Sequence, residues 1–382
     1  MTAYLTGVPV TYTAVARTDG YTAGNHTYAW QFDDSTTASG ASTNKTWSTT
    51  GLHTAVVTAT NSITGGTATD QRTIKVRSVP TTWISSNTFS PILPYKTIAY
   101  GNGVYLAAAF ASTVLTVARS TDGINWTQVY TNNFTPDPIT RIRLAYGNGR
   151  FCLTLQGSTA IQGIYTSGDN GDSWTSVGVT SRQWSDITYG NGRFVAVANG
   201  GGATGQFAHS DDGISFTQVN SHSDKQWISV ACNGSVFAAV ALNQVDTSKS
   251  TDGATWSAGG SSPVASTWDE ITAGEGIFVA RRFNSTTQPF MYSIDNGTTW
   301  TLNTAITTID VRTIAYGDGI FIANGNSIAT NGSLYSFNGQ TWTTFNQLNA
   351  TWLDAVYNGV DRFYAINSNP TGISPVTQYL EW

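Results

Sequence analysis

The sequence predicts an all-β protein that consists of a small N-terminal β-sandwich and a larger unit built from repeats. Three observations support this class. The chain of 382 residues is 40% apolar and 12% aromatic but only 11% charged, whereas about a quarter of the residues of an ordinary globular protein are charged. Thr, Val, Ile, Tyr and Trp, which favour strands, are plentiful, and Glu occurs at only three positions. The 38 glycines supply the tight turns that many short strands require.

The first part is predicted to span residues 1–78. Two stretches, TYAWQFDD and GLHTAVVTATN, show the alternation of a sandwich strand with one solvated face. They resemble the strands of PKD domains, which are immunoglobulin-like β-sandwiches. The resemblance implies that Trp30 anchors the core and that the module acts as a spacer or docks to another protein. Either Ala55, Val57 and Ala59 or the threonines Thr54, Thr58 and Thr60 face the core.

The second part is predicted to span residues 79–382 and to repeat one β-hairpin seven times. The first copy is TIAYGNGVYLAAA, and the copies begin at Thr97, Arg143, Asp186, Ser229, Glu270, Thr313 and Asp354. Each copy has an inner strand, a turn such as Gly-Asn-Gly, and a second strand of small and branched residues. The Asn-Gly pair suits a two-residue hairpin turn, because both positions need a positive φ.

A second motif, Ser-x-Asp-(x)-Gly-x-x-Trp, follows six of the hairpins. Its copies begin at Ser120, Ser167, Ser210, Ser250, Ser293 and Ser336. It resembles the Asp-box of sialidase-type and related β-propellers. We expect the carboxylate to accept backbone N–H bonds across a hairpin turn and the glycine to take the strained φ. The sixth copy has Asn338 in place of the aspartate. The Asp-box carboxylates are therefore expected to form turns and not a site.

Together the two motifs give four strands per repeat over ~40–45 residues, the size of a propeller blade. The last copy ends in SPVTQYLEW, which offers only a third strand, whereas the segment around Trp83 has the sequence of a fourth strand without the preceding ones. Trp83 also continues the aromatic series of the Asp-box motifs. We therefore expect a seven-bladed β-propeller that is closed by pairing of its N- and C-terminal strands. Such pairing removes an open sheet edge.

The expected ligand site is a rim of side chains just before the inner strands, because the ligands of propellers usually meet the mouth of the channel. Six of the seven equivalent positions provide candidate ligand-binding residues, namely Tyr95, Arg141, Trp184, Trp227, Trp268 and Trp352. Flat aromatic rings stack on the C–H faces of sugars, and an indole N–H adds a polar contact. The alternative is that these rings fill the core between blades.

Charged residues occur near the same end of the inner strands, at Arg141, Arg143, Arg182, Arg312, Asp186, Asp269, Glu270 and Asp354. The Arg-Ile-Pro motif of sialidases is absent. A glycosidase in general needs only two carboxylates, and Asp269 or Glu270 facing Asp186 or Asp354 would supply them. We expect instead that these charges are solvated or salt-bridged, that the chain has no catalytic residues, and that it is not an enzyme. A glycoside hydrolase is the alternative.

No cofactor and no metal are expected. Metal-ligand spacing is not found among His26, His53, His209 and His222. The net charge of −5 and the lack of a basic run argue against nucleic acid as a partner. No apolar stretch approaches the ~20 residues that span a bilayer, so membrane insertion is not expected. The two cysteines, Cys152 and Cys232, are expected to be buried free thiols.

An all-β chain with Ser, Thr and Asn surfaces, an immunoglobulin-like module and no export signal is typical of bacteriophage virions, whose proteins leave the cell by lysis. We predict a virion surface protein, either a capsid decoration or a tail-associated adhesin. Its N-terminal domain would bind other virion proteins, and its propeller would bind host-surface glycans weakly, with avidity from many copies. This prediction is an analogy at the level of the fold. The alternatives are a hydrolase of host polysaccharide and an intracellular assembly-factor propeller.

Overall fold

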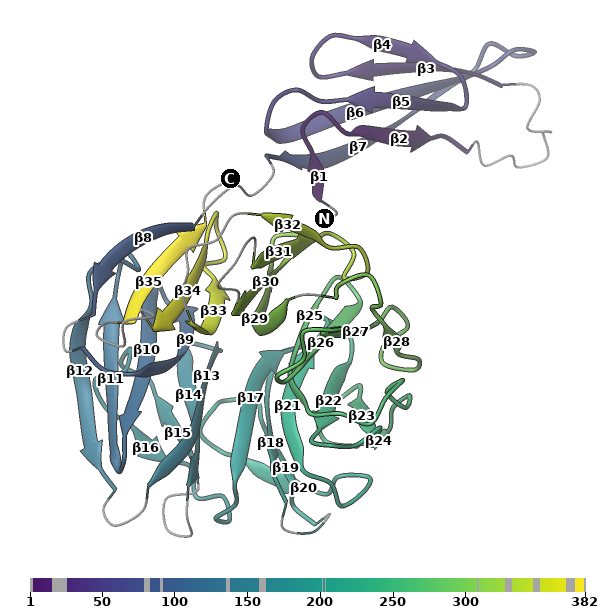
Figure 1. Cartoon of the computed structure of the whole chain (residues 1–382). Helices are drawn as coiled ribbons and strands as arrows, with labels where there is room; N and C mark the ends of the chain where they lie inside the picture. The colour runs from purple at the N-terminus through teal and green to yellow at the C-terminus, as the bar shows by residue number, and fades with distance from the viewer. Residues whose placement is uncertain are drawn as a thin grey trace. The chain divides into compact units, whose positions relative to one another are not determined.

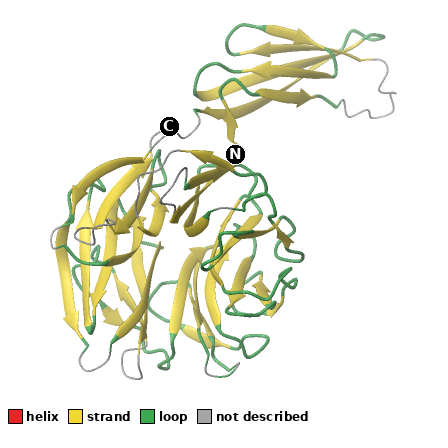
Figure 2. Ribbon diagram, viewed as in Figure 1, coloured by secondary structure: helices red, strands yellow, loops and turns green. Residues whose placement is uncertain are grey.

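The computed structural model describes residues 3–15, 26–78, 83–89, 92–134, 138–157, 163–200, 202, 204–307, 309–326, 332–345, 351–368 and 375–380. These residues form strands, turns and loops, and no helix occurs among them (Figure 2). It follows that the described part of the chain holds no helix that could cross a membrane. The all-β prediction is confirmed. The chain divides into two compact units, Met1–Pro80 and Thr81–Glu381.

The N-terminal unit contains one five-stranded and one two-stranded sheet. In order, the larger sheet holds β1 (Ala3–Leu5), β7 (Thr67–Arg77), β6 (Gly51–Asn61), β3 (His26–Phe32) and β4 (Thr37–Ser39). The smaller sheet pairs β2 (Pro9–Thr13) with β5 (Ser42–Thr46). Strand β1 is parallel to β7, and the other pairs are antiparallel.

Residues of both sheets meet in one apolar core in this unit. Trp30 is 4% exposed, and its indole N–H donates to the carbonyl of Gly40 at 2.9 Å. The rings of Trp30 and Tyr12 lie 5.8 Å apart, which joins β3 to β2. Ala55 is buried in the same core, and Val57 packs against it. The prediction that Trp30 belongs to the core of this unit is therefore confirmed. Of the two faces of β6, the one with Ala55 and Val57 is turned to the core.

The second unit is built from seven four-stranded antiparallel sheets (Figure 1). In the first six, the strands follow one another in chain order. The first sheet holds β9 (Tyr95–Gly101), β10 (Val104–Ala111), β11 (Val114–Ser120) and β12 (Thr127–Asn133). The second holds β13 (Ile139–Gly147), β14 (Arg150–Gly157), β15 (Gly163–Ser167) and β16 (Thr175–Ser176). The third holds β17 (Trp184–Gly190), β18 (Arg193–Ala198), β19 (Phe207–Ser210) and β20 (Thr217–Val219).

The next three sheets follow the same plan. The fourth holds β21 (Trp227–Cys232), β22 (Phe237–Ala241), β23 (Thr247–Ser250) and β24 (Ser257–Ala258). The fifth holds β25 (Trp268–Gly274), β26 (Ile277–Arg282), β27 (Phe290–Ser293) and β28 (Thr301–Leu302). The sixth holds β29 (Asp310–Gly317), β30 (Ile320–Asn326), β31 (Ser333–Ser336) and β32 (Thr343–Phe345).

The seventh sheet combines strands from both ends of the unit. It holds β33 (Thr351–Tyr357), β34 (Phe363–Ser368), β35 (Pro375–Leu380) and β8 (Trp83–Thr88). Strand β35 is antiparallel to β8, with Tyr379 opposite Ile84. The ring of Trp83 lies 5.0 Å from that of Trp352, and its indole N–H donates to the hydroxyl of Ser333 at 3.0 Å. Trp352 belongs to the seventh sheet and Ser333 to the sixth. The segment that precedes the first sheet in the chain therefore pairs with the seventh sheet and also contacts the sixth.

The first strand of each sheet lies in the middle of the unit. These inner strands contact one another in the order β9, β13, β17, β21, β25, β29 and β33, and β33 also contacts β9. Each inner strand has a register shift, as a β-bulge produces. In six strands the shift lies directly before the hairpin motif, as between Trp184 and Asp186 in β17. In β13 it lies earlier, between Ile139 and Arg141.

The Tyr-Gly-Asn-Gly sequence of the hairpin turns has a packing reason. A Cβ on Gly147 would lie 2.1 Å from ring atoms of Tyr189, which belongs to the next sheet. Only glycine therefore leaves room for the ring. The two residues that follow, Asn148 and Gly149, have φ values of 46° and 76°, as a two-residue hairpin turn requires. Tyrosines of the next sheet occupy the same place at Gly101, Gly274 and Gly317.

Both cysteines are free thiols. Cys152 is buried, and burial raises the pKa of its thiol to about 12. Cys232 is only half-buried and takes the place of the tyrosine against Gly190. The prediction of a buried thiol is therefore confirmed for Cys152 and wrong for Cys232, because the channel side of β21 leaves Cys232 partly open.

Candidate functional site

The aromatic residues of the predicted rim lie inside the protein. Tyr95, Trp184 and Trp227 are 0% exposed, and Trp268 and Trp352 are 1% exposed. Three of the indole N–H groups donate to backbone carbonyls, those of Thr180, Ser223 and Val264. The prediction of an exposed aromatic rim is therefore wrong, and the alternative of a core between sheets holds. The physical reason is that each large ring gains free energy when its apolar surface leaves water.

Arg141 is the member of the predicted rim that does reach the channel. Because the register shift of β13 comes early, Ile139 is buried and Arg141 is half-buried. Its guanidinium donates to carbonyls of three successive sheets, those of Ser185 at 2.8 Å, Ile228 at 3.4 Å and Asp269 at 3.2 Å. Burial lowers the pKa of Arg141 to about 10, and neighbouring Arg143 adds to this effect. Arg141 thus ties three inner strands together.

A second set of residues forms a polar ring at the hairpin motif, four residues before each inner turn. We call this set the channel ring, and its members are Thr97, Arg143, Asp186, Ser229, Glu270, Thr313 and Asp354. Of its members, only the charged ones, Arg143, Asp186, Glu270 and Asp354, were candidates from the sequence. The signal for the whole ring was nevertheless present, because this position of the repeat is polar in all seven copies and is followed by an apolar residue in each.

Four members of the channel ring cap a backbone N–H group of the next sheet. Thr97 accepts from Leu144 at 3.3 Å, Asp186 from Val230 at 3.0 Å, Ser229 from Ile271 at 3.1 Å, and Asp354 from Ile98 at 3.0 Å. Asp186 also accepts from the Ser229 hydroxyl. Each bond satisfies a buried N–H group. The bond from Asp354 links the seventh sheet to the first.

Three members depart from this capping pattern. The Arg143 guanidinium has no acceptor atom, and its one hydrogen bond within the described part of the chain is to the carbonyl of Ile142 at 3.3 Å. Glu270 turns its Oε2 to Nε of Arg281 at 2.7 Å, within its own sheet. Thr313 accepts from Asn324 of its own sheet at 3.4 Å. The side chains of Arg143 and Glu270 therefore do not cap the next sheet.

The channel ring lines a cavity of about 390 Å³ that continues toward the hairpin turns. Six ring members contribute to it, all except Thr313. A second cavity of about 290 Å³ shares Glu270 and Asp354 with the first. At the turn end the larger cavity is lined by half-exposed tyrosines, namely Tyr100, Tyr146, Tyr189 and Tyr316. The volume lies within the range of small-molecule sites, although the lining is more polar than usual.

Burial and opposite charges together set the electrostatics of the cavity. Burial raises the pKa of Asp354 to about 6, although the facing Arg143 opposes the shift. Burial also raises the pKa values of Asp186 and Asp269. Burial by itself would lower the pKa of Arg143, but the carboxylates around it, Asp354 foremost, raise it above its ordinary value. Arg143 therefore stays charged in a mainly acidic surrounding.

The remaining charged candidates do not line this cavity. Arg182 donates to the carbonyl of Gly200 at 3.4 Å. Arg312 forms an ion pair with Asp310 at 2.6 Å. Asp269 lies 3.0 Å from Arg281 and thereby shares this arginine with Glu270. The expectation of salt-bridged charges is thus met at Arg312, Asp269 and Glu270.

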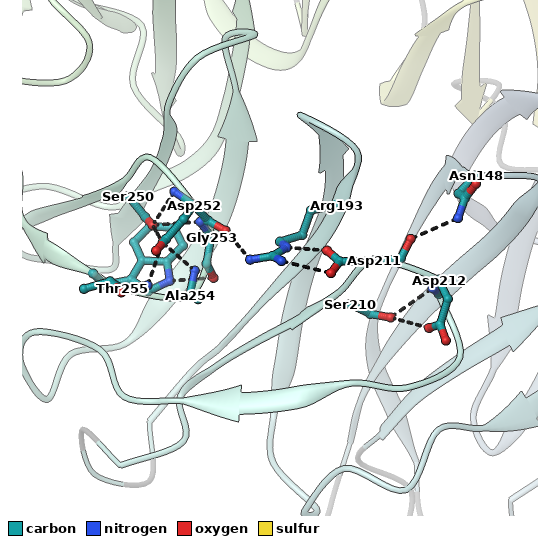
Figure 3. Close-up of polar contacts among 12 residues, drawn as sticks. Asn148, Arg193, Ser210, Asp211, Asp212, Ser250, Asp252, Gly253, Ala254 and Thr255 are labelled. Atoms are coloured by element: carbon teal, nitrogen blue, oxygen red, sulfur yellow. Dashed lines mark hydrogen bonds and ion pairs between the residues drawn. The ribbon is translucent and has the colours of Figure 1, made fainter.

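The Ser-x-Asp turns stabilise the outer part of the sheets (Figure 3). Asp252 Oδ1 accepts two backbone N–H groups at 2.9 and 2.7 Å and the hydroxyl of Ser250 at 2.8 Å. The N–H of Thr255 foremost lowers the pKa of Asp252 well below its ordinary value. Arg193 forms an ion pair with Asp211 and donates to the carbonyl of Asp252 in the next sheet. These carboxylates are occupied by turn hydrogen bonds, as the sequence indicated.

Metal ligands do not gather in the part of the chain that the structure describes. No group of three or more His, Cys, Asp or Glu side chains in it could hold a metal ion. The histidines of the second unit, His209 and His222, are not among the residues that line the channel cavity. The polar side chains that line the cavity carry a guanidinium, carboxylates, hydroxyls and the thiol of Cys232.

Comparison with known proteins supports this division of the chain. A family model described as PKD domain matches residues 2–76, which lie in the N-terminal unit. A search of curated proteins gives no significant match.

Solved structures of similar fold are found for the larger part of the chain. One is YCF48 bound to D1 peptide, with 13% identity over 78% of this chain and 96% of that chain and a TM-score of 0.56. Another is virginiamycin B lyase from Staphylococcus aureus, with 10% identity over 78% and 99% and a TM-score of 0.61. A third is the Cps50 (Swd1) β-propeller domain of Myceliophteria thermophila, with 6% identity over 78% and 98% and a TM-score of 0.51. Such low identities show the fold alone, which is that of a β-propeller.

The expectation that the chain is not an enzyme is corrected by these comparisons. Virginiamycin B lyase is an enzyme, and its structure is similar to 78% of this chain. The expectation had depended on the missing sialidase motif. That motif excludes only one chemistry, whereas the fold carries function in sites that differ from protein to protein.

Proposed function

We propose that the protein is a virion surface protein, a capsid decoration or a tail-associated adhesin, whose propeller binds host-surface glycans. The PKD-type unit would attach it to other virion proteins, and the protein would be extracellular after lysis. The chain composition and the match to a PKD domain beside a propeller support this proposal. It remains an analogy at the level of the fold.

The observation that carries the glycan-binding part is the polar cavity of the channel. It combines a charged guanidinium, carboxylates and hydroxyls with tyrosine rings at its outer end. Polar groups of both kinds, together with aromatic faces, are what a sugar requires for hydrogen bonding and stacking. This cavity takes the place of the aromatic rim, whose rings are buried.

We further propose that the second unit is a seven-bladed propeller with Asp-box turns, closed by its N- and C-terminal strands. The seven four-stranded sheets, the pairing of β35 with β8, and the bond from Asp354 to Ile98 support this. The test is a double variant, Ser85→Cys/Gln378→Cys, whose positions face each other in the register. Opposed positions suit the geometry of a disulfide, so we expect an oxidised cross-link visible by electrophoresis. Cross-linking no better than in the control Ser85→Cys/Ser176→Cys would contradict closure.

Mass spectrometry of purified particles tests the location without assuming a ligand. We expect peptides of this chain in washed virions at a constant ratio to the major capsid protein. Peptides found only in the lysate would contradict the virion assignment. A glycan array with the purified chain tests the ligand class separately.

Hydrolysis of host polysaccharide is the second candidate function. One observation favours it, because Glu270 and Asp354 line the same two cavities and burial raises the pKa of Asp354 to about 6. A carboxylic acid beside a carboxylate is the pair that glycosidases use. Release of reducing ends that is lost in Glu270→Gln would establish this function, and no release would exclude it for the polysaccharide tested.

A further inference from the structure

We infer, on the basis of the proposed function, that Arg143 and Glu270 form a two-point site for a neutral sugar, which they hold by a vicinal diol inside the channel cavity. Arg143 donates to the hydroxyl oxygens, and Glu270 accepts from the hydroxyl hydrogens.

The first reason comes from the repeat itself. In a repeated ring, a residue that serves the fold is expected to follow the contact pattern of its equivalents. Thr97, Ser229 and Asp354 do so, since each caps the next sheet. Arg143 and Glu270 do not, although they occupy the same position of the motif and line the same cavity. Their side chains are therefore available for another partner.

The second reason is the complementary set of free atoms. Among the described residues, the Arg143 guanidinium has only the bond to Ile142, and no carboxylate lies within ion-pair distance of it. Most of its N–H donors therefore face the cavity without a protein acceptor. Glu270 uses Oε2 for Arg281 and keeps Oε1 without a hydrogen bond to the described residues. Each sugar hydroxyl both donates and accepts, so a vicinal diol fits between a guanidinium and a carboxylate.

The third reason is the charge of the cavity, which favours a neutral ligand. Among the residues that line the cavity, one arginine, Arg143, is set against three carboxylates, those of Asp186, Glu270 and Asp354. When all are ionised, the sum of +1 and −3 is −2. An acidic sugar would place a further negative charge among these carboxylates at a cost in low-dielectric surroundings. A cation would meet the unpaired guanidinium of Arg143.

The fourth reason is access. The cavity of about 390 Å³ reaches from the channel ring to the half-exposed tyrosines near the turns. Arg141 bridges three inner strands on the opposite side of the ring. A sugar would therefore enter between these half-exposed tyrosines and would meet Arg143 and Glu270 at the inner end.

The test is saturation-transfer NMR on the full chain with methyl glycosides of glucose, galactose and mannose. N-acetylneuraminic acid serves as the acidic probe, and tetrahydropyran serves as a ring without hydroxyls. The variants are Arg143→Met and Glu270→Gln, which keep the approximate side-chain volume. Matched controls are Arg193→Met and Glu275→Gln, which lie outside the cavity. Unfolding midpoints show which variants are folded, and Arg143→Lys replaces Arg143→Met if the latter does not fold.

We expect saturable binding of at least one neutral glycoside, with affinity reduced at least about tenfold in Arg143→Met and in Glu270→Gln, as for lost hydrogen bonds to charged groups. The two controls should bind like the wild type, and N-acetylneuraminic acid should bind more weakly than the neutral probe. Three results would each overturn the inference. The wild type could bind no neutral probe, both cavity variants could bind as tightly as the wild type, or the wild type could prefer the acidic probe. If glycan binding persists in both variants, the two-point site is wrong but the proposed function is not affected. If the chain is absent from purified particles, the proposed virion function is wrong but the sugar site is not affected.

Discussion

Replacing Gly147 by alanine should destabilise the propeller through a contact between two sheets. The new Cβ would lie 2.1 Å from Cγ and Cδ2 of Tyr189. Carbon atoms need a separation of about 3.5 Å, so the ring or the backbone has to move by about 1.4 Å. Tyr189 cannot move freely, because its ring packs at 4.8 Å against that of Phe194. We therefore expect the upper part of the range for overpacking, about 3 kcal/mol.

The matched control is Gly149→Ala, two residues further along the same turn. Gly149 has φ +76° and no atom within 4 Å of an added Cβ. Its replacement should cost only the left-handed backbone penalty of about 1–2 kcal/mol. The contrast between the two alanines therefore separates the packing effect from the backbone effect.

Calorimetric unfolding of the full chain measures both changes. A loss of about 3 kcal/mol corresponds to a decrease in Tm of roughly 5 °C for a unit of about 300 residues. Tyr189→Ala should relieve the overlap, so the double variant with Gly147→Ala should be more stable than the sum of the single effects by at least about 1 kcal/mol. Equal losses for Gly147→Ala and Gly149→Ala, or additive effects in the double variant, would refute the proposed contact.

Three further predictions concern other parts of the propeller. In the native state the pKa of Asp354 is raised from 3.8 to about 6, so the native state binds the proton more tightly than the unfolded state does. The protonated carboxyl therefore contributes at most about 3 kcal/mol to the free energy of unfolding. This contribution is present below about pH 4 and is lost as the pH rises through about 6. Urea unfolding at several pH values should show this loss in the wild type and not in Asp354→Asn; parallel pH profiles would contradict it. Trp227→Ala should lower the free energy of unfolding by about 3–5 kcal/mol, since the ring is fully buried. Any folded fraction of this variant should bind glycosides like the wild type. A folded variant that no longer binds them in NMR would contradict this prediction. Asp212→Ala removes the acceptor of two N–H groups at 2.8 Å and should lower the free energy of chemical unfolding by about 1–2 kcal/mol. Asp212→Asn should be nearly neutral, because Asn338 accepts the equivalent bonds at 2.9 and 2.8 Å. Equal losses in the two variants would show that another contact of Asp212 matters.

Much of the fold could be predicted from the sequence because the repeat is a local pattern. The alternation around Ala55, the Asn-Gly turns and the Ser-x-Asp motif each depend on contacts within a few residues or between adjacent strands. The strand character of the segment around Trp83 followed from the repeat in the same way, and in the structure this segment lies beside β35.

The candidate site could be predicted only in part. The sequence indicated that charges gather near the inner strands, but it assigned ligand contact to the recurring indoles and overlooked Thr97 and Ser229. Whether a tryptophan faces a channel or a core depends on a bulge of one residue, and hydrophobicity alone does not reveal which side the ring takes. The same shift, displaced in β13, is what brings Arg141 to the channel.

By itself the sequence determined the strand content, the number of repeated hairpins and the turn chemistry, because these follow from local propensity and periodicity. Only the tertiary structure decided which side chains of the channel ring cap a backbone N–H group of the next sheet and which are available to a ligand. Arg143 and Asp186 occupy the same place in the motif and line the same cavity, yet only Asp186 caps a backbone N–H group of the next sheet, that of Val230. That difference arises from hydrogen-bond partners on other sheets, which no pattern within one repeat contains.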